Sequence, residues 1–216
     1  VNGYLFDFAK KVEPYKDNEF GATLLSNIYD PTTKEGVLTF DSDVTQIGYK
    51  AFYECEKLTS VTIPDRVTTI GVGAFAFCHS LKEFKGKYAT DNGRCLIKDN
   101  TIIAYASASA SGTEYTIPDS VITIGERAFD SCYDLTSVTI PDSVTTIGDY
   151  AFSFCESLTS ITIPDSVTTI GYSAFNCCCS LTSVIIGDSV TEIEWEAFAY
   201  CDKIKYIYCK PTTPPT

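Results

Sequence analysis

The chain has 216 residues, 44% of them hydrophobic, and a formal net charge of −12. That hydrophobic share supports a folded core, so the composition excludes a wholly disordered chain. No apolar run approaches the roughly 18 residues of a membrane-spanning helix, so direct membrane insertion by this segment is not expected. The sequence begins at Val1 and contains no Met, as expected for a trimmed product whose targeting signal lies elsewhere.

The negative charge is concentrated in one half of the chain. Residues 113–200 contain thirteen acidic residues and one basic residue, Arg127, and so carry the whole net charge. Nucleic acids and anionic membranes are bound through Lys and Arg, so neither is an expected partner. The acidic half predicts a solvated surface, with a basic partner as the alternative.

Residues 1–39 contain no copy of the 23-residue repeat that begins at Phe40. Within them, residues 22–29 and 36–40 flank the turn sequence Asp-Pro-Thr-Thr, which predicts a β-hairpin. An exposed end coil of a repeat protein needs a cap. We therefore predict that residues 1–39 form an N-terminal cap.

The 23-residue repeat occupies residues 40–208. Residues 140–162 read IPDSVTTIGDYAFSFCESLTSIT, and residues 163–185 read IPDSVTTIGYSAFNCCCSLTSVI. One copy cannot bury enough apolar surface to fold alone, so the copies must stack into a solenoid. The six copies start at Phe40, Ile63, Ile117, Ile140, Ile163 and Ile186.

Each copy mixes two periodicities. Residues 158–163, LTSITI, end in a period of two, which predicts a short strand with Ser160 and Thr162 facing outward. The apolar residues in 147–158 step by three and four, which predicts one or two helical turns, and Pro-Asp at 164–165 predicts a turn. The expected fold is an α/β solenoid, with a parallel β-sheet on its concave side and short helical turns on its convex side.

The second copy is followed by an insert, residues 86–116. Its β-prone runs 94–97 and 101–105 flank Lys-Asp-Asn, which predicts a hairpin. The insert either patches an irregular coil or protrudes as a contact loop. Residues 209–216 form a Pro/Thr-rich tail, which fits a last strand, a linker or a frayed end.

The string IGxxAFxxC, which recurs at a fixed phase with LTSVTIPDSV, resembles the BspA-like leucine-rich repeat of bacterial surface proteins. The resemblance implies a leucine-rich-repeat solenoid that is secreted or displayed at the bacterial cell surface. It also implies a non-enzymatic role in adhesion, with a host or cell-surface protein or glycan as partner, host extracellular matrix included. The last copy has Gly187 in place of Pro and Glu194 in place of Gly, as an end repeat would.

Cysteine is the residue type with the most regular spacing. The four cysteines outside the repeat phase, Cys95, Cys177, Cys179 and Cys209, are candidates for exposed thiols, and the sequence leaves their pairing open. The others are expected to form a ladder of small buried side chains. They are Cys55, Cys78, Cys132, Cys155, Cys178 and Cys201.

No catalytic or cofactor motif is present. His79, the only histidine, falls at a variable surface position, and no nucleophile, phosphate-loop or zinc motif occurs. We therefore expect no enzyme and no cofactor. Asp residues recur just after each strand, where Asx turns are the expected role and Ca²⁺ between coils is the alternative. The four consecutive ones are Asp119, Asp142, Asp165 and Asp188.

The outward side chains of the predicted strands are the best candidate binding surface. Short hydroxyl groups form a flat strip there, and two aromatic residues at one end either anchor a ligand or pack against a cap. A structural spacer with no ligand of its own is the alternative function. The candidate binding residues are Ser137, Thr139, Ser160, Thr162, Ser183, Ile185, Tyr206 and Tyr208.

Overall fold

The computed structural model of the chain describes its strands and turns over most of the sequence. The chain divides into two compact units. The first comprises residues 1–97 and 103–110, and the second comprises residues 98–102 and 111–216. The described residues are 3–8, 20–32, 35–90, 92–108 and 112–210.

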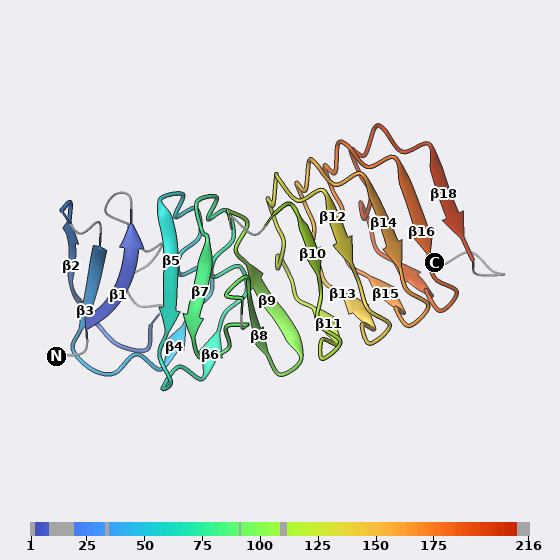
Figure 1. The fold of residues 1–216 in the computed structure, drawn as a ribbon. Helices are drawn as coiled ribbons and strands as arrows, with labels where there is room; N and C mark the ends of the chain where they lie inside the picture. Colours follow the sequence, from blue (N-terminus) through green and yellow to red (C-terminus); the bar gives the residue numbers. More distant parts are fainter. Residues whose placement is uncertain (1–2, 9–19, 33–34, 91, 109–111, 211–216) are drawn as a thin grey trace. The chain divides into compact units, whose positions relative to one another are not determined.

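The first unit contains two rows of strands (Figure 1). β5 (Leu58–Ile63) and β7 (Glu83–Gly86) are parallel, with Ser60 opposite Glu83. β1 (Gly3–Phe8) pairs antiparallel with both β3 (Glu35–Phe40) and β5. A short second row pairs β4 (Gln46–Ile47) with β6 (Thr69–Ile70) in parallel. The five-stranded sheet has the order β2 (Leu24–Asp30), β3 (Glu35–Phe40), β1 (Gly3–Phe8), β5 (Leu58–Ile63), β7 (Glu83–Gly86).

The second unit repeats the same plan over more coils. Its main row contains β10 (Glu114–Thr116), β12 (Ser137–Thr139), β14 (Ser160–Ile163), β16 (Ser183–Ile186) and β18 (Tyr206–Cys209). Its second row contains β11 (Thr123–Ile124), β13 (Thr146–Ile147), β15 (Thr169–Ile170) and β17 (Glu192–Ile193). Pairing is parallel in both rows (Figure 1). Partners lie one repeat apart, so the parallel-sheet solenoid is confirmed, whereas the second row was not predicted.

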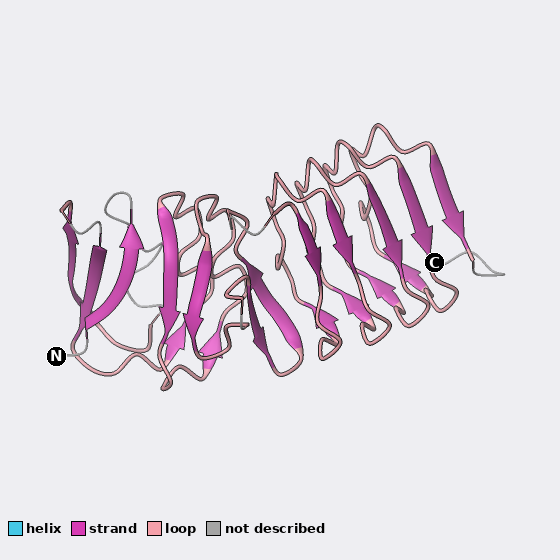
Figure 2. Cartoon of the chain, viewed as in Figure 1, coloured by secondary structure: helices cyan, strands magenta, loops and turns pink. Residues whose placement is uncertain are grey.

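The predicted helical turns are wrong for the described residues, which contain strands and turns but no helix (Figure 2). Each coil instead makes successive tight turns, in which the Ala151 amide donates to the Gly148 carbonyl and the Ser153 amide to the Tyr150 carbonyl, at 3.2 and 3.1 Å. Tyr150 and Phe154 have positive φ angles of 54° and 56°. An α-helix requires negative φ throughout, so these positions interrupt it.

Hydrogen bonds between coils take the place of helical ones. The Phe152 amide donates to the Ala174 carbonyl of the next coil at 2.7 Å, and the amides two residues to either side make equivalent bonds at 2.9 and 2.8 Å. This side of the coil is therefore a third ladder, in addition to the two rows of strands. Apolar residues spaced by three and four reach the core from tight turns, which explains why their spacing resembled that of a helix.

A column of phenylalanine rings runs through the core of the second unit. Phe129, Phe152, Phe175 and Phe198 are stacked with ring centroids 4.8, 5.1 and 5.1 Å apart, and adjacent rings lie within 13° of parallel. The first three side chains are fully buried. The column fixes the spacing of successive coils, because each ring fills the gap below the next.

The first coil of the first unit is covered by the segment before it. The Phe20 ring lies 5.0 Å from that of Phe40 and 5.6 Å from that of Phe52, which stacks in turn on Phe75 at 5.5 Å. β1 pairs with the edge of β5 that β7 leaves open.

The domain limits 1–39, 40–208, 86–116 and 209–216 stay predictions. Residues 1–2, 9–19 and 211–216 lie outside the described part of the chain.

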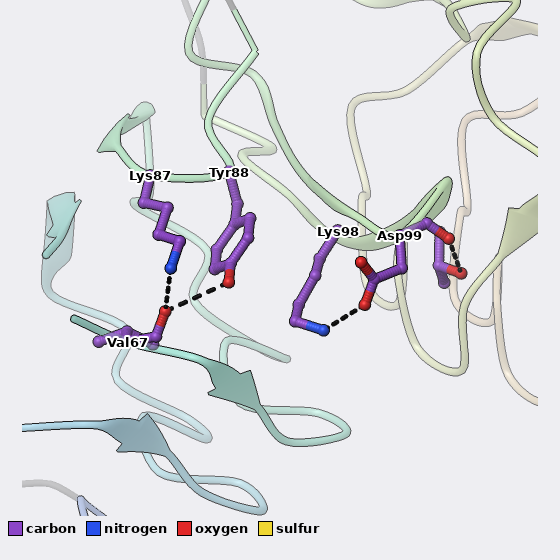
Figure 3. A network of polar contacts seen from close by, with 6 residues as sticks. Val67, Lys87, Tyr88, Lys98 and Asp99 are labelled. Atoms are coloured by element: carbon purple, nitrogen blue, oxygen red, sulfur yellow. Dashed lines mark hydrogen bonds and ion pairs between the residues drawn. The ribbon is translucent and has the colours of Figure 1, made fainter. Parts of the chain in front are cut away.

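The start of the 86–116 insert is fastened to the coil before it. Lys87 Nζ and the Tyr88 hydroxyl donate to the Val67 carbonyl at 2.9 and 3.2 Å (Figure 3). Lys87 Nζ also donates to the Asp65 carbonyl at 2.8 Å. Because these bonds satisfy carbonyls of the turn after β5, this part of the insert completes a coil, which favours the patching role. Further along, β8 (Cys95–Lys98) and β9 (Thr101–Tyr105) are neighbouring strands, and Lys98 pairs with Asp99 (Figure 3).

Candidate functional site

The strand face of the second unit consists of the outward side chains of β12, β14, β16 and β18. Along β14, Ser160 and Thr162 are exposed, whereas the residues after each are buried. The parallel register sets Ser183 opposite Tyr206 and Ile185 opposite Tyr208. The ladder is interrupted between β12 and β14, which belong to separate sheets. The structure thus places all eight candidate residues on the strand face: Ser137, Thr139, Ser160, Thr162, Ser183, Ile185, Tyr206 and Tyr208.

The strand face changes character along the stack. Its β12 and β14 positions carry only hydroxyl side chains, which donate and accept hydrogen bonds and lose little conformational entropy when held. Ile185 on β16 is 37% exposed, and Tyr206 and Tyr208 on β18 are 72% and 66% exposed. Within the described part of the chain, these two rings are therefore available for contact.

A second aromatic row, which shares one phase of the repeat, packs only in part; its members are Phe77, Phe154 and Tyr200. The Phe77 ring lies 5.1 Å from that of Tyr53 and 6.0 Å from that of His79, edge to face in the second case. Phe154 is partly buried, whereas Tyr200 is 68% exposed. Packing therefore describes the earlier members of the row and not the last.

The six in-phase cysteines form the expected buried ladder. The Cys155 thiol donates to the Phe129 carbonyl of the preceding coil at 3.2 Å, and Cys78, Cys178 and Cys201 make the equivalent bond at 3.1, 3.2 and 3.1 Å. Burial raises the pKa of the Cys155 thiol well above its ordinary value. The Cys155 thiol therefore serves the stacking of coils as a neutral donor.

The expectation of four exposed thiols is wrong for two of them. Cys95 is fully buried in β8, and Cys177 is partly buried, with its pKa raised first by that burial and then by Cys179. Cys179 and Cys209 are exposed. All ten cysteines are free thiols in this structure. The repeat period predicts which side chains are buried only within the repeat itself. Cys95 lies in the insert, so its burial could not be predicted in this way.

Thiol labelling distinguishes these environments. In the native protein at neutral pH, a water-soluble disulfide reagent is expected to modify Cys179 and Cys209 rapidly and the six ladder thiols only after unfolding. The ladder thiols are buried and therefore inaccessible to the reagent, and burial also raises the pKa of the Cys78 and Cys155 thiols, which disfavours the reactive thiolate. A Cys179→Ser variant should lose one fast equivalent. Rapid modification of any ladder thiol in folded protein would contradict the buried ladder.

Among the aspartates that follow the strands, Asp165 does not make the expected Asx turn. Its Oδ1 accepts a hydrogen bond from Lys210 Nζ at 2.8 Å and from the Asp188 amide of the next coil at 3.2 Å. The Lys210 ammonium, and then the Asp188 amide, lower the pKa of the Asp165 carboxyl below its ordinary value. The Lys210 ammonium and the Asp188 amide therefore offset the electrostatic repulsion between the aspartate carboxylates of successive coils at this position.

No metal centre is formed by the described residues, which contain no group of three or more His, Cys, Asp or Glu side chains placed to hold an ion. His79 packs against Phe77 and is partly buried. Among those same residues, no helix is long and apolar enough to cross a membrane. A shallow polar depression borders β7, where Glu83 and Lys85 form an ion pair at 2.6 Å beside Thr90 and Asn92.

One buried ion pair was missed by sequence reasoning. Arg127 Nη1 contacts Asp130 Oδ2 at 2.6 Å, where the aspartate side chain is 1% exposed, and the guanidinium lies 4.1 Å from the Tyr150 ring centroid. In the sequence, Arg127 stands out only as the single basic residue of the acidic half. Its place directly before the repeated Ala-Phe pair, with an acidic residue three positions further on, was the available signal.

A leucine-rich-repeat solenoid is defined by parallel coils of constant length that stack on one another. The second unit has such coils, with three backbone ladders and with core residues that recur at the same position of every repeat. The sequence matches the BspA type leucine-rich repeat region in six copies, over residues 31–92 and 100–213. The chain therefore belongs to the BspA type leucine-rich repeat family. No curated protein matches it.

Solved structures of similar chains agree with this assignment. A leucine-rich cell surface protein from Faecalibacterium prausnitzii is 29% identical over 78% of this chain and 52% of its own, with a TM-score of 0.60. A leucine-rich repeat protein from Eubacterium ventriosum is 26% identical over 77% of this chain and 52% of its own, with a TM-score of 0.61. One from Bacteroides capillosus is 27% identical over 57% of this chain and 99% of its own, with a TM-score of 0.51. The chain thus spans about half the length of the first two.

Proposed function

We propose that the chain is a non-enzymatic recognition module, secreted or displayed at the bacterial cell surface, that binds a protein or glycan through the strand face. The observation that carries this proposal is the exposed pair Tyr206 and Tyr208 at the end of a flat hydroxyl strip. Exposed tyrosines supply contact area at low entropic cost and often anchor interfaces. A flat row of hydroxyls suits the hydrogen-bonding groups of a glycan or a protein backbone.

The cell-surface setting is supported by the relative from Faecalibacterium prausnitzii, which is described as a cell surface protein. The net charge of −12 opposes nucleic acid as a partner. A host or cell-surface protein, extracellular matrix included, or a glycan is the class of partner that we propose. An acidic surface would also favour a basic protein, and salt dependence distinguishes that contact from one made by the strand face.

Binding to immobilised fibronectin, fibrinogen, collagen, mucin and a glycan array tests this function. We expect saturable binding to at least one, weakened by about tenfold or more in the Tyr206→Ala/Tyr208→Ala variant, because loss of an anchor of this kind costs about 1.4 kcal/mol or more. Trp195→Ala is the matched control, since Trp195 is 84% exposed in the same coil but lies off the strand face.

The competing function, a structural spacer, predicts a different outcome. A folded wild-type protein that binds none of the immobilised partners would contradict the recognition module and favour the spacer. Binding that disappears with added salt in wild-type and variant alike would instead assign recognition to the acidic surface.

A further inference from the structure

Three consecutive cysteines, residues 177–179, occupy one turn of the coil that begins at Ile163. The middle one belongs to the buried ladder, whereas Cys179 is exposed and Cys177 is partly buried. Hydrogen bonds join this turn to the coils on both sides. The Phe154 amide of the preceding coil donates to the Asn176 carbonyl at 2.8 Å, and the Cys177 amide donates to the Ala199 carbonyl of the following coil at 2.9 Å. The two accessible thiols therefore belong to an internal coil.

The backbone holds Cys177 and Cys179 at the two ends of a tight turn. The Cys179 amide donates to the Cys177 carbonyl, two residues earlier, at 2.8 Å, and Cys177 has a positive φ of 57°. The end residues of a turn closed in this way lie within the span of about 4.4–6.8 Å between Cα atoms that a disulfide requires. A bridge can therefore form here without separating the coils.

Side chains at these two positions of the repeat lie against each other. In the coil that begins at Ile63, the equivalent residues are Phe77 and His79, whose rings meet edge to face with centroids 6.0 Å apart. Phe77 has a positive φ of 61°, as Cys177 has one of 57°. Of the six coils, only the one that begins at Ile163 carries cysteine at both positions.

The two thiols differ in accessibility, and this difference assigns their roles. The Cys179 thiol is exposed and lies 4.0 Å from the Tyr200 carbonyl, a long contact that rotation of the side chain breaks. Burial first, and then Cys179 and Cys201, raise the pKa of the Cys177 thiol, which disfavours its reactive thiolate. Cys179 is therefore the thiol that meets a reagent first, and Cys177 is the one that reacts afterwards.

The charge around the pair favours a cationic reagent. Glu156 and Asp202 occupy the position of Cys179 in the preceding and following coils, and Lys203 comes directly after Asp202. All three side chains are exposed, so these neighbours are net negative. Such surroundings attract small cations and repel small anions.

We propose that Cys177 and Cys179 are a redox-active dithiol that closes to a disulfide by exchange with a small cationic disulfide. The Cys179 thiolate attacks one sulfur of the small disulfide, and the first small thiolate leaves. The Cys177 thiolate then attacks Cys179 Sγ in the mixed disulfide, and the second small thiolate leaves. The protein loses two electrons and two protons, and the small disulfide gains them as two thiols. An exposed bridge across so short a turn is readily reduced, so the exchange is reversible.

Exchange with cystamine, a small disulfide that carries two ammonium groups, is the experiment. The full chain with Cys209→Ser is used, because Cys177 and Cys179 are then the remaining thiols that are not buried. After quenching with acid, mass spectrometry of the chain and of its peptides should find a bridge between Cys177 and Cys179 and no cysteamine adduct. Dithiothreitol should restore both thiols.

Adding Cys177→Ser to this parent gives the matched control. Serine already stands at the equivalent position of the coil that begins at Ile117, as Ser131, so the fold and the circular dichroism spectrum should be unchanged. Without the second thiol the mixed disulfide at Cys179 should persist, at least about tenfold more abundant than in the parent. A parent that stays reduced or keeps its adduct, or a control that loses its adduct as the parent does, would overturn the proposal.

Discussion

Replacing Phe152 with alanine should lower the free energy of unfolding by about 4 kcal/mol, as is typical for loss of a large buried aromatic side chain. Phe152 is fully buried and stacked between Phe129 and Phe175, at 4.8 and 5.1 Å. Its neighbours are held by ladders on three sides of the coil, so they cannot collapse into the space that the ring leaves. Urea denaturation followed by circular dichroism measures the change.

Ile122→Ala is the control for that measurement. Ile122 belongs to the same unit but is 47% exposed, so truncation should cost less than about 1 kcal/mol. Equal losses for the two variants would mean that the phenylalanine column does not hold the coils together. A repeat array can also lose cooperativity, so the slope of the denaturation curve is compared as well.

Gly71→Ala should be the second severe variant, with a loss of about 3 kcal/mol from overpacking against rigid backbone. A Cβ at this position would lie 2.5 Å from the Gly48 carbonyl carbon and 2.5 Å from the Tyr49 amide nitrogen. Neither atom belongs to a flexible side chain, so the two coils would have to separate. The glycine is therefore required by the close approach of the preceding coil.

Thermal unfolding of Gly71→Ala beside Val72→Ala tests this requirement. Val72 is the next residue and is 39% exposed, so its truncation should shift the midpoint little. A Gly71→Ala midpoint equal to that of the wild type would show that the coils can separate without loss.

The parallel sheet and the coil length could be predicted from sequence, because both follow directly from the 23-residue period. Buried positions such as Ile161 and Cys155 also followed, since a residue type that recurs in one phase must meet the same environment in every coil. Their exposures of 2% and 0% agree with that expectation.

The tight turns and the second row of strands could not be predicted in the same way. Spacings of three and four residues bring side chains to one side in a helix and in successive turns alike. What distinguishes the two is the hydrogen bond from Phe152 to Ala174 and the positive φ at Tyr150 and Phe154. Those are properties of backbone contacts between coils, and tyrosine or phenylalanine does not indicate positive φ.

In the candidate site, too, some features could be predicted from the sequence and others could not. Period two placed Ser160 and Thr162 outward, and both are exposed. The exposure of Ile207 was not predictable, because its core-facing phase implied burial and only the absence of a described coil beside β18 leaves it accessible. Irregular sequence outside the repeat, as at Cys95, gave no phase from which burial could be inferred.

Recognition through the strand face is tested most directly by placing bulky charged side chains at the centre of that surface. Surface plasmon resonance would compare wild-type protein with Ser160→Lys/Thr162→Lys on each partner that the wild type binds. Ile122→Lys/Tyr133→Lys adds the same charge at exposed positions off the strand face. We predict a Kd at least about tenfold higher for the strand-face variant and an unchanged one for the control. Unchanged affinity in a folded strand-face variant would contradict recognition through this surface.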